Sequence, residues 1–219
     1  MLGVIFDLDG TLLNTVPDLT TAANAMLAHY GARPVSERQV MDYLGHGLSV
    51  LVKRALPAEA MIDPIEALDV FNTQYAQVYR NQTHPYPGII ALVNELVARR
   101  IPVSVVSNKA QLFLDGLVAL HFPDTPFMAV IGERTDLPRK PDPMGLLRAA
   151  QAMNTDPNST ILVGDTEVDA QAATNAGMRM VGVDWGFRPA SALREAGVKT
   201  ILASPQEMLE LMNDYAIME

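Results

Sequence analysis

The chain has 219 residues, 49% of them hydrophobic, so it is long enough to bury a substantial core. Its formal net charge of −9 argues against nonspecific binding to nucleic acid. No apolar run approaches the roughly 20 residues that span a bilayer, so we expect a cytoplasmic protein. It contains no cysteine, which excludes disulfides, thiol catalysis and cysteine-ligated zinc.

The first predicted element is a buried strand that starts at Val4 and gives way to two carboxylates. Asp7 and Asp9 are alternate residues, so in extended chain they point to the same side. Two negative charges this close resist joint ionisation unless a cation or hydrogen bonds stabilise them. Asp9-Gly10 is also typical of a surface turn, and a turn and a functional site can coincide here. The residues before the strand form no basic region, so we expect no targeting segment there.

Residues 14–84 are predicted to form helices, without a convincing strand. One helix starts at Asn14 or Thr15, either of which can be its N-cap, and ends near Gly31. A second begins at Ser36, and further helices are indicated over residues 48–56 and 63–80. This run of helices indicates an inserted helical domain over residues 14–84.

Beyond residue 85, short strands and helices alternate. Strands are predicted at 103–106, 128–132, 160–163, 180–183 and 200–202, and helices at 89–100, at 110–120, at 168–176 and in a segment that ends at 153. This alternation is typical of a parallel sheet joined by helical crossovers. We therefore predict an α/β fold, with a Rossmann-like parallel-sheet core of residues 1–13 and 85–219 and the helical domain as an insertion.

Polar residues follow several of these strands, at the sheet edge where open parallel sheets bind ligands. Besides the two aspartates near the N-terminus, this edge is expected to carry Ser107, Asn108, Lys109, Lys140, Asp165 and Asp169. Simpler interpretations exist for each of them. Ser107 can be a helix N-cap, and Lys140 can be a solvated loop cation. Asp165 and Asp169 can cap the next helix and complement its dipole.

As a set, these carboxylates, the hydroxyl and the lysine suit phosphoryl transfer with a hard divalent cation. Oxygen ligands in a chain without cysteine favour Mg²⁺. A carboxylate is ionised at neutral pH and can act as a nucleophile without a base. A second carboxyl two residues later can protonate the leaving oxygen and afterwards take a proton from water. The expected partner is a small phosphorylated metabolite.

Four segments resemble the ordered motifs of the haloacid dehalogenase superfamily of phosphohydrolases, over essentially the whole chain. They are Asp7-Leu8-Asp9-Gly10-Thr11, Ser107-Asn108-Lys109, Lys140-Pro141 and the segment from Gly164 to Asp169. The resemblance implies Asp7 as nucleophile and Asp9 as general acid and base. It also implies that Ser107, Lys140, Thr11 and Asn108 bind the substrate phosphoryl group, and that Asp7, the Asp9 carbonyl, Asp165 and Asp169 hold Mg²⁺.

The insertion at 14–84 is similar to the C1-type helical cap of that superfamily. A carboxylate at Asp9 implies phosphatase rather than dehalogenase chemistry. Gly45-His46-Gly47 and Arg54 are similar to a cap segment of phosphoglycolate phosphatases, in which two glycines let the backbone approach the ligand and His46 or Arg54 can reach its carboxylate. The same residues can instead form a helix-breaking turn and a solvated helix face. Asn14 stands where many relatives have Asp, which concerns hydrogen bonding between cap and core more than catalysis.

Other functions remain open at this point. A β-phosphoglucomutase-like mutase, a phosphonatase or a pyrophosphatase shares the same motifs, and Lys53 would be the cap lysine that a phosphonatase needs. A non-catalytic protein that binds a phosphorylated ligand would also keep the site. The sequence allows a monomer or a homodimer.

Overall fold

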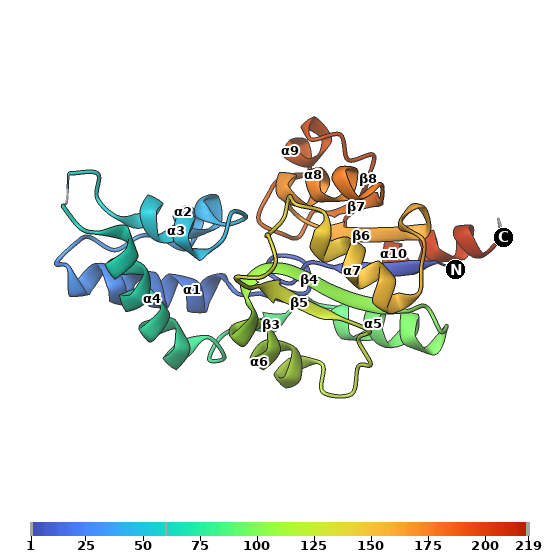
Figure 1. Cartoon of the computed structure of the whole chain (residues 1–219), viewed down its shortest axis with the longest axis horizontal. Helices are drawn as coiled ribbons and strands as arrows, with labels where there is room; N and C mark the ends of the chain where they lie inside the picture. Colours follow the sequence, from blue (N-terminus) through green and yellow to red (C-terminus); the bar gives the residue numbers. More distant parts are fainter. Residues whose placement is uncertain (1, 60, 218–219) are drawn as a thin grey trace. The chain divides into compact units, whose positions relative to one another are not determined.

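The computed structural model describes residues 2–59 and 61–217. The chain divides into two compact units, Met1–Leu13 with Pro85–Glu219, and Asn14–His84 (Figure 1). The first unit holds a six-stranded sheet, and the second is helical. In the described part of the chain, no helix is both long enough and apolar enough to cross a membrane.

The sheet is parallel throughout, as the alternation of strands and helices predicted. Its strands are β1 (Gly3–Phe6), β4 (Val103–Ala110), β5 (Val130–Glu133), β6 (Thr160–Gly164), β7 (Arg179–Val183) and β8 (Thr200–Leu202), in the order β5-β4-β1-β6-β7-β8. Phe6 is in register with Val105 on one side and with Val163 on the other. The end of β1 therefore lies beside the end of β6, and also beside the part of β4 that leads to Ser107.

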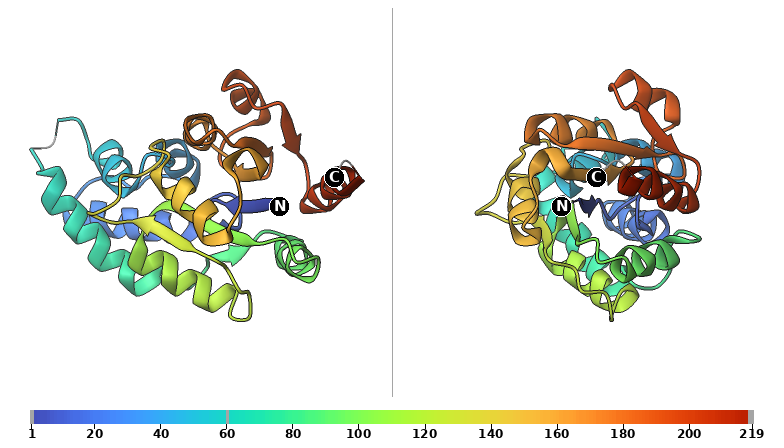
Figure 2. Two further views of the ribbon diagram at one scale, coloured as in Figure 1. Left: turned by 45° about the vertical axis from the view of Figure 1, so that its right-hand side comes forward. Right: turned by 90° about the vertical axis from the view of Figure 1, so that its right-hand side faces the viewer.

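Helices cover both faces of the sheet (Figure 2). The helices α7 (Met144–Met153) and α8 (Glu167–Ala176) pack against each other and against the central strands. Their contact with the sheet forms a core that includes Ile5, Val106, Leu146, Leu162 and Ala173. The helices α5 (Ile89–Ala98) and α10 (Pro205–Ile217) pack together, and α6 (Gln111–His121) contacts β4 and β5. Because both faces are covered, the two central strands β1 and β6 are apolar almost throughout.

The helical unit contains α1 (Val16–His29), α2 (Glu37–Tyr43), α3 (Leu48–Ala55) and α4 (Pro64–Val78). Ser36 begins α2 as predicted, through a capping box with Gln39. The α1 and α4 helices pack along each other. The buried carboxylate of Asp18 accepts the backbone N–H groups of Gln82 and Thr83 at 2.8–3.0 Å, which fixes the end of the unit against the start of α1.

The structure corrects several element boundaries. The sequence predicted no strand over 14–84, but Asn14 and His84 each belong to a two-residue strand, β2 (Leu13–Asn14) and β3 (His84–Pro85), which pair with each other. Strands this short give no alternating pattern to detect. The β4 strand continues to Ala110, four residues beyond the predicted end, because its polar end still pairs with β5 at Glu133. The helices α9 (Ala190–Glu195) and α10 were not predicted.

Candidate active site

The loop after β1 turns back on itself at the carboxyl edge of the sheet. The Leu8 carbonyl oxygen accepts the backbone N–H groups of residues 11, 12 and 13 at 2.9–3.3 Å. Gly10 has a φ of +84°, and a Cβ atom at this position would lie 2.3 Å from Oδ2 of Asp165. Glycine alone fits both the backbone angle and the close approach. The Asp9-Gly10 pair is therefore a turn and also part of the site.

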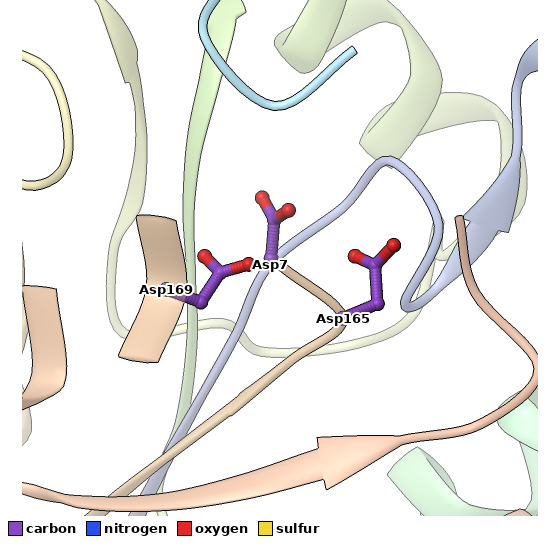
Figure 3. A group of neighbouring side chains, drawn as sticks. All are labelled: Asp7, Asp165 and Asp169. Atoms are coloured by element: carbon purple, nitrogen blue, oxygen red, sulfur yellow. The ribbon is translucent and has the colours of Figure 1, made fainter. Parts of the chain in front are cut away.

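Three buried carboxylates meet at this edge. Asp7 follows β1, Asp165 follows β6, and Asp169 lies in the first turn of α8 (Figure 3). One carboxylate oxygen from each lies within 4.8 Å of the others. The register of β1 with β6 produces this meeting, because it brings two strand ends to the same height.

Lys140 neutralises part of this charge. Its Nζ atom lies 2.9 Å from Oδ1 of Asp7 and 2.6 Å from Oδ1 of Asp169, and all three side chains are buried. Although burial lowers the Lys140 pKa, the two carboxylates raise it above its ordinary value, so the ammonium stays charged. The alternative in which Lys140 is a solvated loop cation is wrong.

Burial sets the electrostatics of the carboxylates themselves. It raises the pKa of Asp7 to about 6, against the opposing attraction of Lys140. Burial, together with the charges of Asp169 and Asp7, raises the pKa of Asp165 well above its ordinary value, although hydrogen bonds from the Phe187 N–H and the Thr11 hydroxyl oppose the shift. A cation at this position would restore the ionised forms.

Asp169 combines a structural and an electrostatic contact. Its Oδ2 atom accepts hydrogen bonds from the N–H and the hydroxyl of Thr166, the N-cap of α8, while its Oδ1 atom accepts one from Lys140. The helix-capping interpretation is thus correct for Asp169, which is also part of the acidic cluster. Asp165 precedes the N-cap and does not cap the helix.

Ser107 and Asn108 lie on the last part of β4. Ser107 is buried and is not a helix N-cap, because α6 begins at Gln111 with Ala110 as its N-cap. The Asn108 amide holds the backbone of Lys140 at two points: its Nδ2 donates to the Lys140 carbonyl at 2.9 Å, and its Oδ1 accepts the Lys140 N–H at 2.8 Å. This contact connects the two motif segments, and sequence reasoning did not predict it.

Sequence reasoning also assigned no contact to Lys109. Its buried Nζ donates to Oδ1 of Asp9 at 2.9 Å, so the acid–base candidate has a lysine partner. Alternation on β4 could have indicated that Lys109 and Ser107 share a face, but the partner in the turn after β1 depends on strand order. Tyr86 is a further neighbour: burial, with the charges of Asp165 and Asp9, raises its pKa above the ordinary value.

The predicted cap residues belong to the helical unit. Gly45 and Gly47 have φ values of +107° and +88°, and Gly47 is the N-cap of α3. His46 and Arg54 are exposed, and Arg54 donates to the Asp42 carbonyl at 3.2 Å. The Asn14 side chain accepts the Val16 N–H at 3.3 Å, at the start of α1.

The acidic cluster fits a hard divalent cation. It offers carboxylate oxygens only, close enough together to share one ion. With Asp9 beside the cluster, four aspartates face the two lysines that contact them, Lys109 and Lys140. When all six side chains are ionised, this leaves a net negative charge. Such a charge is stable only when a cation or protons balance it.

The chain is similar to known proteins over most of its length. The chain matches the family described as haloacid dehalogenase-like hydrolase over residues 4–183. It is 36% identical to a phosphoglycolate phosphatase of Nitrosospira multiformis, over 95% of this chain and 94% of that protein, and 34% identical to one of Vibrio cholerae, over 88% of each. A crystal structure of a candidate phosphoglycolate phosphatase from Lactobacillus delbrueckii subsp. bulgaricus superposes with a TM-score of 0.89 at 30% identity, over 95% of this chain and 97% of that one.

Proposed function

Because the chain belongs to the haloacid dehalogenase-like hydrolase family, as its four motifs predicted, we propose that it is a Mg²⁺-dependent phosphatase whose substrate is phosphoglycolate. The observation that carries the proposal is the contact of Asp7 with Lys140 beside Asp165 and Asp169. The proposed nucleophile, a buried cation that can bind phosphate, and three carboxylates that can hold a metal ion lie together. The names of the relatives support phosphoglycolate as the substrate.

In the first step, a carboxylate oxygen of Asp7 attacks the phosphorus and the bond from phosphorus to the ester oxygen breaks. Asp9 gives its proton to the leaving oxygen, which departs as the alcohol of glycolate, and an aspartyl phosphate remains on Asp7. The Asp9 carboxylate contacts Lys109 at 2.9 Å, which holds it in place when it is ionised.

In the second step, Asp9 takes a proton from water and the resulting hydroxide oxygen attacks the phosphorus. The bond from phosphorus to Asp7 breaks, inorganic phosphate leaves, and both carboxylates return to their starting state. Ser107, Lys140, Asn108 and the turn at Thr11 are proposed to bind the phosphoryl oxygens. Mg²⁺, held by Asp7, Asp165, Asp169 and the Asp9 carbonyl, would supply further positive charge at the phosphoryl group.

Phosphate release from a panel of phosphorus compounds, with and without Mg²⁺, tests the proposal. Phosphoglycolate should be the fastest substrate, compared with β-glucose 1-phosphate, phosphonoacetaldehyde and pyrophosphate, which represent the alternative enzymes. Asp7→Asn should abolish turnover, whereas Asp69→Asn, at an exposed carboxylate on α4, should not change it. A protein that releases no phosphate from any of these compounds would refute the proposed phosphatase function.

For the helical unit, the sequence resemblance supports contacts of Gly45, His46, Gly47 and Arg54 with the substrate carboxylate. Arg54→Ala should then raise KM about tenfold or more with little change in kcat, as expected for the loss of a charge-assisted hydrogen bond. Arg33→Ala, at an exposed arginine of the same unit, is the matched control. An equal KM for both variants would exclude Arg54. The monomeric or homodimeric state and the cytoplasmic location stay predictions.

A further inference from the structure

The segment Trp185–Phe187 comes shortly after β7, which is the neighbour of β6 in the sheet. It therefore lies near Asp165, the residue that follows β6. By sequence alone, this segment either leans over the site or is a packed loop. In the structure, the Trp185 side chain and the Phe187 N–H donate hydrogen bonds at the site. Gly186 lies close to Asp165 because it has no side chain.

The Asp165 carboxylate is enclosed between two glycines. A Cβ atom on Gly186 would lie 2.3 Å from Cβ of Asp165 and 2.6 Å from its Oδ2 atom, and a Cβ atom on Gly10 would lie 2.3 Å from the same Oδ2. Side chains do not approach one another so closely. Any residue larger than glycine at position 186 must therefore displace the segment or Asp165.

A chain of hydrogen bonds closes around the same carboxylate. The Phe187 N–H donates to Oδ2 of Asp165 at 2.7 Å, and the Thr11 hydroxyl donates to Oδ1 at 3.1 Å. The indole N–H of Trp185 donates to the Thr11 carbonyl at 3.0 Å. These hydrogen bonds form a closed path from Trp185 to Thr11, from Thr11 to Asp165, and from Asp165 to Phe187.

We propose that Trp185–Phe187 is a positioning segment that orients the Asp165 carboxylate, and the turn at Gly10 and Thr11, for binding a divalent cation. Each Asp165 oxygen has one lone pair engaged by the protein, which leaves the other lone pair of each for the metal and fixes the carboxylate plane before the metal arrives. Partners of this kind, one contact away from the ion, raise affinity because the ligand loses less rotational freedom on binding. The effect on turnover rests on the proposed phosphatase function, whereas the effect on metal binding does not.

Metal-free protein titrated with Mg²⁺ tests this inference. The shift of the thermal unfolding midpoint with Mg²⁺ concentration gives the affinity in every variant. Because Trp185 is the single tryptophan of the chain, its fluorescence gives a second measure in wild type and in Gly186→Ala. The Mg²⁺ concentration for half-maximal phosphate release is measured in parallel.

Gly186→Ala should weaken Mg²⁺ binding about 10-fold to 100-fold, the usual effect of disturbing a residue that supports a metal ligand. Trp185→Phe keeps an aromatic ring but loses the N–H donor, and should weaken binding about fivefold, the effect of one lost hydrogen bond. The control is Gly177→Ala at the C-cap of α8, where φ is +69° and a Cβ atom meets nothing within 4 Å. It should lower the metal-free midpoint and leave the Mg²⁺ affinity within about twofold of wild type.

If Gly186→Ala and Trp185→Phe lower the metal-free midpoint but bind Mg²⁺ like Gly177→Ala, the segment is only packing and the inference is wrong. Should Gly186→Ala fail to fold, Trp185→Phe decides alone. If wild type binds Mg²⁺ and the two variants bind it more weakly, but no ester is hydrolysed, the inference stands and the proposed function fails. If wild type hydrolyses an ester and both variants keep the same Mg²⁺ requirement, the proposed function stands and the inference fails.

Discussion

Replacing Lys140 by methionine removes the cation that the buried carboxylates share and nearly preserves side-chain volume. The Lys140 ammonium lies 2.9 Å from Asp7 and 2.6 Å from Asp169. The exposed fraction of the side chain is 4% for Lys140, 9% for Asp7 and 1% for Asp169. Removing one partner of a buried ion pair costs about 3–5 kcal/mol, because the other charge stays buried without compensation.

Proton uptake limits this cost. The pKa of Asp7 is already raised to about 6 by burial, and Lys140 is the main influence that lowers it. Without the ammonium the Asp7 pKa rises further, so at neutral pH the carboxyl takes up a proton instead of remaining an isolated charge. We therefore expect the lower end of the range, about 3 kcal/mol less free energy of unfolding in EDTA. Mg²⁺ should recover part of the loss.

Urea unfolding at neutral pH, in EDTA and in Mg²⁺, measures these free energies. Lys199→Met, at an exposed lysine of the same unit, is the control and should change stability by less than about 0.5 kcal/mol. In EDTA, adding Asp7→Asn to Lys140→Met should recover part of the lost stability, because it removes a carboxyl that must otherwise take up a proton at neutral pH, while Asp169 still lacks its cation. If Lys140→Met lowers the free energy of unfolding in EDTA by less than about 1 kcal/mol, the ion pair contributes less to stability than this reasoning requires.

Three further outcomes are expected. Between the ordinary Asp7 pKa of 3.8 and its folded value of about 6, the native state binds more protons than the unfolded state. The free energy of unfolding of the metal-free wild type, measured in urea, should therefore fall by up to about 3 kcal/mol relative to Asp7→Asn as pH rises through this window. Asn108→Ala should lower kcat about tenfold or more at unchanged Mg²⁺ affinity, because Lys140 loses both backbone contacts, and steady-state kinetics with a metal titration check this. Lys109→Met should slow alkyl phosphates more than p-nitrophenyl phosphate, since only the poorer leaving group needs a well-placed proton donor; equal losses would contradict a role through Asp9.

Much of the fold was predictable because it depends on local periodicity. The strands are short apolar runs, and the helices between them have a repeat of 3.6 residues; neither signal requires knowledge of neighbours in space. The ends of elements were less predictable. The polar residues from Ser107 to Lys109 suggested that β4 had ended, but pairing with β5 carries the strand through Ala110.

The sequence by itself determined the candidate residues of the site. Asp7, Asp9, Ser107, Lys140, Asp165 and Asp169 stand at or just beyond strand ends or in the loop and helix that follow, and in a parallel sheet those positions share one edge. Tertiary structure alone decided which of them touch. Three hydrogen-bonded contacts join residues that are 32 to 174 positions apart in the chain: Lys109 with Asp9, Asn108 with Lys140, and Trp185 with Thr11. Such contacts follow from strand order and from the paths of loops, neither of which leaves a periodic signal in the chain.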